Sequence, residues 1–179
     1  MKTKRLYLAG FMGSGKSTLG LILANKIGWD FFDLDKLIEA KFGMKVVDIF
    51  REFGEDEFRK AETDTLTEVS KHDDSVISLG GGTIAFGDNL KIVKKHGKLI
   101  YLSSSPEKIL ERLKFKTDRP LFQTTSNVNA TREEAMAKIV SMLEKRKPYY
   151  SQADLEFSTD RMSVGRSVEL LAKIIERKL

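Results

Sequence analysis

The sequence contains no cysteine and only two histidines among its 179 residues. The absence of cysteine excludes a disulfide scaffold and a thiolate metal site. His72 and His96 are too few and too scattered to indicate a histidine zinc site. No apolar run approaches the ~18 residues that a membrane-spanning helix needs, so we expect no membrane partner. The basic N-terminus leads into an apolar stretch that breaks at Gly10, so we expect a cytoplasmic rather than a secreted protein.

Charge is unevenly distributed along the chain, whose formal net charge is +5. Residues 1–89 carry 12 basic and 15 acidic side chains, whereas residues 90–179 carry 19 and 11. A basic C-terminal half suits an anionic ligand. Basic and acidic residues are nevertheless interleaved, as over residues 108–112, and no compact nucleic-acid-binding motif is present. We therefore expect no nucleic-acid partner.

The length and a hydrophobic content of 41% are typical of one folded domain, which we predict to span residues 1–179. Short apolar runs alternate with segments of helical spacing. This alternation predicts an α/β three-layer sandwich, with a parallel central sheet and helices on both faces. The predicted strands cover 5–9, 30–34, 75–79, 98–103 and 155–158. The predicted helices cover 16–27, 35–42, 46–53, 55–71, 88–96, 105–114, 131–147 and 163–178, with breaks at Gly54 and Pro148 and a mobile loop over 116–130.

One motif directly follows the first predicted strand. Residues 10–17, Gly-Phe-Met-Gly-Ser-Gly-Lys-Ser, fit the phosphate-binding pattern G-x-x-x-x-G-K-[ST] without a mismatch. The glycines let successive N–H groups point at phosphate oxygens, and the helix that follows adds its positive end. Lys16 supplies charge to the β and γ phosphates, and Ser17 offers a hydroxyl to Mg²⁺. We predict a nucleotide phosphate site whose contacts come from Gly13, Ser14, Gly15, Lys16, Ser17 and Thr18.

A phosphate loop does not by itself name a reaction. A GTPase would need an N-K-x-D segment, which is absent. Five further motifs follow in order: Asp33-Leu-Asp35, Phe58-Arg59, Gly80-Gly81-Gly82, Arg119-Pro120-Leu121 and Arg146-Lys-Pro148-Tyr149-Tyr150. Together with the phosphate loop, they resemble the shikimate kinase family from residue 6 to about residue 150. The resemblance implies a P-loop NTPase fold similar to nucleoside monophosphate kinases. It also implies a substrate-binding region at about 33–62 and a mobile lid at about 112–130.

The resemblance further implies a reaction and a role for each matching residue. The family uses ATP and Mg²⁺ to phosphorylate the 3-hydroxyl of shikimate in aromatic amino-acid biosynthesis. By this match, Asp35 would accept the proton of the substrate hydroxyl, and Asp33 would help Ser17 to hold Mg²⁺, through water. Arg59 and Arg146 would clamp the substrate carboxylate, since a carboxylate suits the guanidinium fork.

The same match places the remaining site residues. Three consecutive glycines, Gly80, Gly81 and Gly82, would let the backbone approach the substrate. Arg119, in the lid, would neutralise charge on the transferred phosphoryl group, so the catalytic residues would be Lys16, Asp35 and Arg119. Arg112 would pack on adenine, with Thr159–Arg161 near it, and the rings of Phe50 and Phe58 would line the substrate pocket.

Each residue also has an ordinary structural alternative. Asp35 could cap the helix over 35–42, Asp33 could cap a loop, and either arginine could form a surface ion pair. A kinase for gluconate or for a nucleotide is the nearest alternative enzyme. A nucleotide-responsive binding module without turnover is the alternative outside catalysis. No coiled-coil pattern or long exposed apolar stripe is present, so we expect a monomer.

Overall fold

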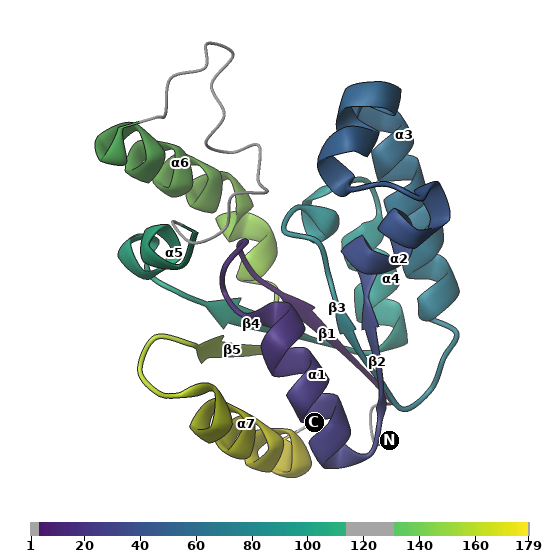
Figure 1. Cartoon of the computed structure of the whole chain (residues 1–179). Helices are drawn as coiled ribbons and strands as arrows, with labels where there is room; N and C mark the ends of the chain where they lie inside the picture. The colour runs from purple at the N-terminus through teal and green to yellow at the C-terminus, as the bar shows by residue number, and fades with distance from the viewer. Residues whose placement is uncertain (1–3, 114–130, 179) are drawn as a thin grey trace.

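The structure is a computed structural model and describes residues 4–113 and 131–178. Within these residues, five parallel strands form one sheet in the order β2-β3-β1-β4-β5 (Figure 1). The strands are β1 (Arg5–Ala9), β2 (Asp30–Asp33), β3 (Ser75–Ser78), β4 (Lys98–Ser103) and β5 (Leu155–Ser158). Parallel neighbours need helical crossovers, so the observed sheet confirms the predicted three-layer α/β fold.

Helices connect the strands and cover both faces of the sheet. They are α1 (Lys16–Ile27), α2 (Leu34–Phe42), α3 (Val46–Val69), α4 (Asn89–His96), α5 (Pro106–Leu113), α6 (Arg132–Tyr150) and α7 (Val164–Lys178), with the short 3₁₀ helix η1 at Thr83–Ala85. Figure 1 shows α1 and α7 together on one face, and α2, α3 and α4 on the other. No helix within the described ranges 4–113 and 131–178 is long and apolar enough to span a bilayer.

The central strand β1 explains the division of the core. Successive side chains of a strand point to opposite faces, so alternate residues of β1 enter different clusters. Leu6 and Leu8 pack with α1 and α7, whereas Tyr7 and Ala9 pack with α2, α3 and α4. All four side chains are buried. A third cluster joins α5 and α6 around Phe11, which lies in the phosphate loop, and so holds that loop against both helices.

The start of α2 differs from the sequence prediction. Asp35 is the candidate cap that the sequence offers as its structural alternative, but the cap is Asp33, whose Oδ1 accepts a hydrogen bond from Lys36 N–H at 3.2 Å. The strand β2 ends at Asp33 because the helix begins immediately after it, at Leu34. Asp35 consequently lies in the first helical turn, where its carboxylate is not used as the N-cap.

The end of α6 also differs from the prediction that the helix would stop before Pro148. The helix continues through Pro148 to Tyr150. A proline within a helix removes one backbone hydrogen bond, here the one to Glu144 O, but Pro148 lies only two residues before the helix ends, so little of the helix follows it. Ser151 N–H donates to Lys147 O at 2.9 Å, and Gln152 Nε2 donates to Pro148 O at 3.0 Å. These bonds satisfy carbonyl groups of the last turn, which ends at the buried Tyr150.

Asp154 connects the loop before β5 to the neighbouring strand. Its carboxylate accepts a hydrogen bond from Leu99 N–H at 2.8 Å and lies 3.0 Å from Lys94 Nζ and 3.4 Å from Lys98 Nζ. Burial raises the pKa of the Asp154 carboxyl, but the Leu99 N–H and the two ammonium groups outweigh burial and hold that pKa below its ordinary value. The ionised carboxylate therefore helps to fix the edge strand β5 on the sheet.

Candidate active site

The phosphate loop lies between β1 and α1, as the sequence predicts. Gly15 precedes the helix with a φ of 94°, a left-handed conformation that glycine adopts without steric cost. No side chain caps the start of α1, so its first N–H groups are available to an anion. Lys16 Nζ donates to the carbonyl oxygens of Gly10 at 2.8 Å and Phe11 at 3.1 Å, which holds the ammonium group over the loop. This arrangement is suited to binding phosphate groups.

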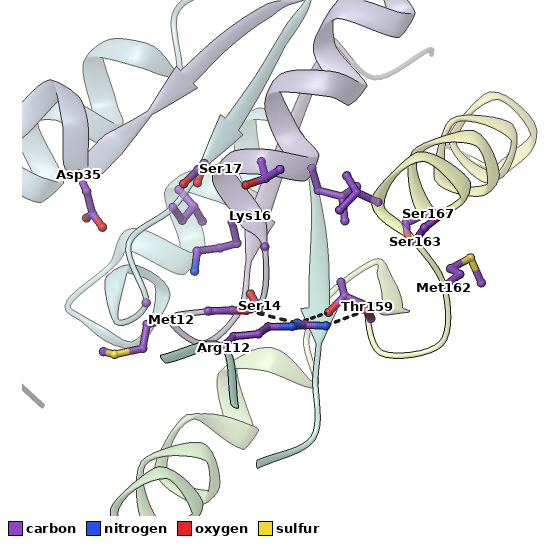
Figure 2. Close-up of a pocket in the computed structure, with 18 residues that line it drawn as sticks. Met12, Ser14, Lys16, Ser17, Asp35, Arg112, Thr159, Met162, Ser163 and Ser167 are labelled. Atoms are coloured by element: carbon purple, nitrogen blue, oxygen red, sulfur yellow. Dashed lines mark hydrogen bonds between the residues drawn. The ribbon is translucent and has the colours of Figure 1, made fainter. Parts of the chain in front are cut away.

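A cavity of about 410 Å³ opens beside this loop (Figure 2). One wall is made by the phosphate loop and the start of α1, and Asp35 lies at one end. The opposite end is formed by Arg112 and by the segment from Thr159 to Ser167. All six predicted phosphate-loop contacts line the cavity, namely Gly13, Ser14, Gly15, Lys16, Ser17 and Thr18.

Arg112 joins the phosphate loop to the segment that follows β5. Its Nη1 donates to Gly13 O at 3.3 Å and to Thr159 Oγ1 at 3.1 Å, and its Nη2 donates to Thr159 O at 3.0 Å (Figure 2). Asp160 lies 3.4 Å from Nη2 and also accepts from Ser105 N–H at 2.7 Å. Burial raises the pKa of Asp160, but these donors and the Arg112 charge outweigh it and hold the pKa below its ordinary value. The tertiary structure thus brings Arg112 and Thr159 to one wall of the cavity.

The residues predicted to bind the substrate, Asp35, Arg59 and Arg146, meet at the three glycines that follow β3. A Cβ atom added at Gly80 would lie 2.8 Å from Asp35 Oδ1 and 2.8 Å from Glu62 Oε1. One added at Gly82 would lie 3.1 Å from Arg59 Nη2 and 3.6 Å from Arg146 Nη2. These distances leave no room for a side chain at Gly80 and little at Gly82, which explains why glycine is needed where the backbone passes between charged groups.

Arg59 is held in place by two carboxylates of its own helix. Its Nη1 lies 2.7 Å from Glu62 Oε2, and its Nε and Nη2 each lie 3.2 Å from Glu55 Oε1. The Glu62 side chain is 1% exposed, and its other oxygen accepts from Thr83 Oγ1 at 2.6 Å. Sequence reasoning missed Glu62. The available signal was its spacing of four from Phe58, which places it on the buried face of α3 beside Arg59.

Arg146 approaches the glycines from α6. Its guanidinium carbon lies 5.2 Å from the centre of the Phe11 ring, a cation–π contact. Its Nη1 is buried and has no hydrogen-bond partner among the described residues. A buried donor without a partner is costly, so its presence indicates an acceptor from outside the described residues. Tyr150 fixes the neighbouring backbone, because its hydroxyl donates to Gly81 O at 3.1 Å.

Known proteins are similar to this chain along nearly its whole length. The sequence model of the family described as shikimate kinase matches residues 12–177. The chain belongs to the shikimate kinase family. Shikimate kinases from Chlorobaculum tepidum and Chlorobium limicola are 45% and 44% identical to it, over 97% and 96% of this chain and 91% and 86% of the relatives. The family expected from the motifs is therefore confirmed.

Solved structures of shikimate kinases have the same fold. The enzyme from Bacteroides thetaiotaomicron is 38% identical, with a TM-score of 0.88 over 97% of this chain and 98% of that one. The enzyme from Acinetobacter baumannii in complex with shikimate is 32% identical, with a TM-score of 0.86 over 99% and 96%. As a member of the shikimate kinase family, the protein is an ATP-dependent kinase whose acceptor is a hydroxyl group of shikimate.

The oxygen donors near the phosphate loop suit Mg²⁺, a metal that kinases commonly use. Ser17 and Asp35 line the same cavity, and Asp33 precedes Asp35 by two residues at the end of β2. Hydroxyl and carboxylate oxygens are hard ligands that Mg²⁺ prefers, usually few in number and completed by phosphate and water. Arg119 and most of the expected lid at about 112–130 lie outside the described residues. Of the aromatic pair, Phe58 is buried and packs against Phe50 with ring centres 4.5 Å apart and the ring planes tilted by 33°.

Proposed function

We propose that the chain is one kinase domain that transfers the γ-phosphoryl group of ATP in line to the 3-hydroxyl of shikimate, giving shikimate 3-phosphate and ADP. One observation carries the assignment of the acceptor site. Asp35, Arg59 and Arg146 come from three different helices and converge on Gly80–Gly82, beside the phosphate loop. The Asp35 carboxylate can accept a hydrogen bond from a substrate hydroxyl, and the two guanidinium groups can bind a substrate carboxylate. Their position next to a nucleotide cavity therefore suits a substrate that carries both groups.

In the proposed acceptor complex, the carboxylate of shikimate binds between Arg59 and Arg146. The buried Nη1 of Arg146 supports this placement, because a ligand carboxylate would supply an acceptor that residues 4–113 and 131–178 do not. Gly80, Gly81 and Gly82 would lie against the ring of the substrate. The substrate-binding region is proposed at about 33–62, which includes α2 and the first two-thirds of α3.

On the nucleotide side, Gly13 to Thr18 would bind the phosphates, and Arg112 would lie against the adenine. Lys16 already lies over the loop, so its charge can follow the β and γ phosphates as negative charge develops. Asp35 would accept the proton of the acceptor hydroxyl as its oxygen attacks. Its place in the first turn of α2, where Asp33 serves as the cap, leaves its carboxylate facing the cavity (Figure 2).

Mg²⁺ would be held by Ser17 directly and by Asp33 through water, and when bound it supplies positive charge to the phosphate oxygens. We propose Arg119 as a third catalytic residue beside Lys16 and Asp35. It would reach the transferred phosphoryl group from a lid at about 112–130, which would also exclude water from the site. We further propose a cytoplasmic monomer that has small-molecule partners only and acts on neither nucleic acid nor membranes.

The test is ADP release from ATP and Mg²⁺, with shikimate, gluconate and nucleoside monophosphates offered separately. Turnover with shikimate alone is expected. Turnover with another acceptor alone would retain the phosphate-loop chemistry and refute the acceptor site. ATP binding without turnover of any acceptor would indicate a binding module instead.

The role of Asp35 is tested by Asp35→Asn. This change keeps the shape of the side chain but removes a proton acceptor, so turnover should fall by ~10²–10⁴. ATP affinity, measured by calorimetry, should stay at the wild-type value. Near-normal turnover of the variant would remove Asp35 from the mechanism.

A further inference from the structure

The two carboxylates that contact Arg59 differ sharply in environment. The Glu62 side chain is 1% exposed, whereas the Glu55 side chain is 65% exposed. Glu62 makes the shorter contact, at 2.7 Å, and Thr83 holds its other oxygen. Glu55 reaches Arg59 through a single oxygen at 3.2 Å, shared between Nε and Nη2. Glu62 is thus a fixed partner of Arg59, while Glu55 is one that a competing anion can replace.

The backbone at Gly54 creates this second contact. Gly54 has φ 81° and ψ 175°, so α3 kinks there and a new helical segment begins at Glu55. Arg59 follows Glu55 by four residues within that segment, the spacing and order that favour an acidic–basic pair on a helix. Glu55 therefore adds a second negative charge beside Arg59, while Arg146 adds a positive charge on the side of Gly82. The negative charge of Glu55 opposes the approach of an anionic substrate to Arg59.

Glu55 and the proposed substrate carboxylate need the same part of the guanidinium group. Nη2, which donates to Glu55, would also lie 3.1 Å from a Cβ atom added at Gly82, with Nη1 at 3.3 Å. Arg146 Nη2 faces the same point, at 3.6 Å. A carboxylate bound between the two arginines would therefore share Nη2 with Glu55 and be repelled by its negative charge.

We propose that Glu55 pairs with Arg59 in the absence of substrate and thereby lowers the affinity for the carboxylate of the acceptor. The proposal rests on the proposed function, because it takes shikimate as the acid that binds Arg59. Arg59 does not depend on Glu55 for its position. Glu62 holds Nη1, and the rings of Phe58 and Phe86 lie 5.5 and 5.7 Å from the guanidinium carbon. Removing the charge of Glu55 should therefore release Arg59 for the substrate without displacing it.

The experiment compares the KM for shikimate in wild type, Glu55→Gln and Glu57→Gln. Glu57 is an exposed residue of the same helix and forms no ion pair with any residue that the structure describes, so its variant controls for the loss of one negative charge. We expect Glu55→Gln to lower the KM for shikimate by roughly two- to fivefold, the range of an exposed ion pair. Its kcat and its KM for ATP should stay at wild-type values, and Glu57→Gln should change none of the three. Glu55→Ala should shift the KM for shikimate in the same direction.

Two results would overturn the proposal. An unchanged or raised KM for shikimate in Glu55→Gln would show that Glu55 does not compete for Arg59 or that it positions this side chain. An equal decrease in Glu57→Gln would show a general effect of net charge. Failure of the proposed function is a separate outcome, because it appears as absent shikimate turnover in the wild-type enzyme before any variant is compared.

Discussion

The buried carboxylate of Glu62 provides the strongest test of how Arg59 is positioned. Removing one partner of a fully buried ion pair costs about 3–5 kcal/mol. Arg59 is 15% exposed and keeps its contact with Glu55, so the lower end applies to Glu62→Ala, about 3 kcal/mol. At about 2–4 °C per kcal/mol for a chain of this size, Tm should fall by about 6–12 °C.

The Tm of the conservative variant Glu62→Gln should lie between that of the wild type and that of Glu62→Ala. Glu62→Gln can still accept the Arg59 N–H and can donate to Thr83 Oγ1, which has Gly80 O at 3.1 Å as an alternative acceptor. Only the charge assistance of the hydrogen bond to Arg59 is lost, so we expect the free energy of unfolding to fall by about 1 kcal/mol. Asp64→Ala is the control, because Asp64 is an exposed residue of the same helix.

Thermal unfolding measures the loss of stability in Glu62→Ala, and steady-state kinetics measure its effect on substrate binding. Without Glu62, the guanidinium group of Arg59 is free to turn toward Glu55, so the KM for shikimate should rise by about tenfold, the value of one charge-assisted hydrogen bond. The KM for ATP should not change. Wild-type Tm in Glu62→Ala would refute the energetic argument, and a wild-type KM in a destabilised variant would reduce Glu62 to a purely structural residue.

Further predictions concern three other contacts. Arg112→Lys replaces a fork by a point charge that cannot span Gly13 and Thr159, so the KM for ATP should rise by about tenfold while that for shikimate stays constant. Tyr150→Phe removes the hydroxyl that holds Gly81 O, which should cost about 1 kcal/mol in urea unfolding and raise the KM for shikimate. Asp154→Asn should destabilise the protein at pH 7, also by about 1 kcal/mol. Because the pKa of Asp154 is lower in the folded than in the unfolded protein, this difference should be constant above about pH 4 and disappear as the pH falls through the folded pKa. If the stability difference between wild type and Asp154→Asn grew on acidification, the result would contradict the assigned partners of Asp154.

Local sequence was sufficient to predict the strands and most helices, because their signals lie within a few adjacent residues. The break at Gly54 is one example, since glycine alone adopts the observed positive φ without strain. Two local predictions were wrong at helix ends, where neighbouring residues compete. Asp33 rather than Asp35 caps α2, and α6 extends through Pro148 because nearby donors satisfy its last carbonyl groups. Both outcomes depend on contacts with a free-energy difference of only about 1 kcal/mol.

The phosphate loop was determined by the sequence itself, since its chemistry resides in eight consecutive residues between a strand and a helix. The acceptor site was predicted only through resemblance, because Asp35, Arg59 and Arg146 lie on separate helices and no local pattern relates them. Tertiary structure revealed Glu62 as the buried partner of Arg59, Glu55 as its exposed second partner and the buried donor on Arg146. Burial and the direction of a charged side chain are set by packing between distant segments, and these properties decide whether an arginine binds a substrate or only its neighbours.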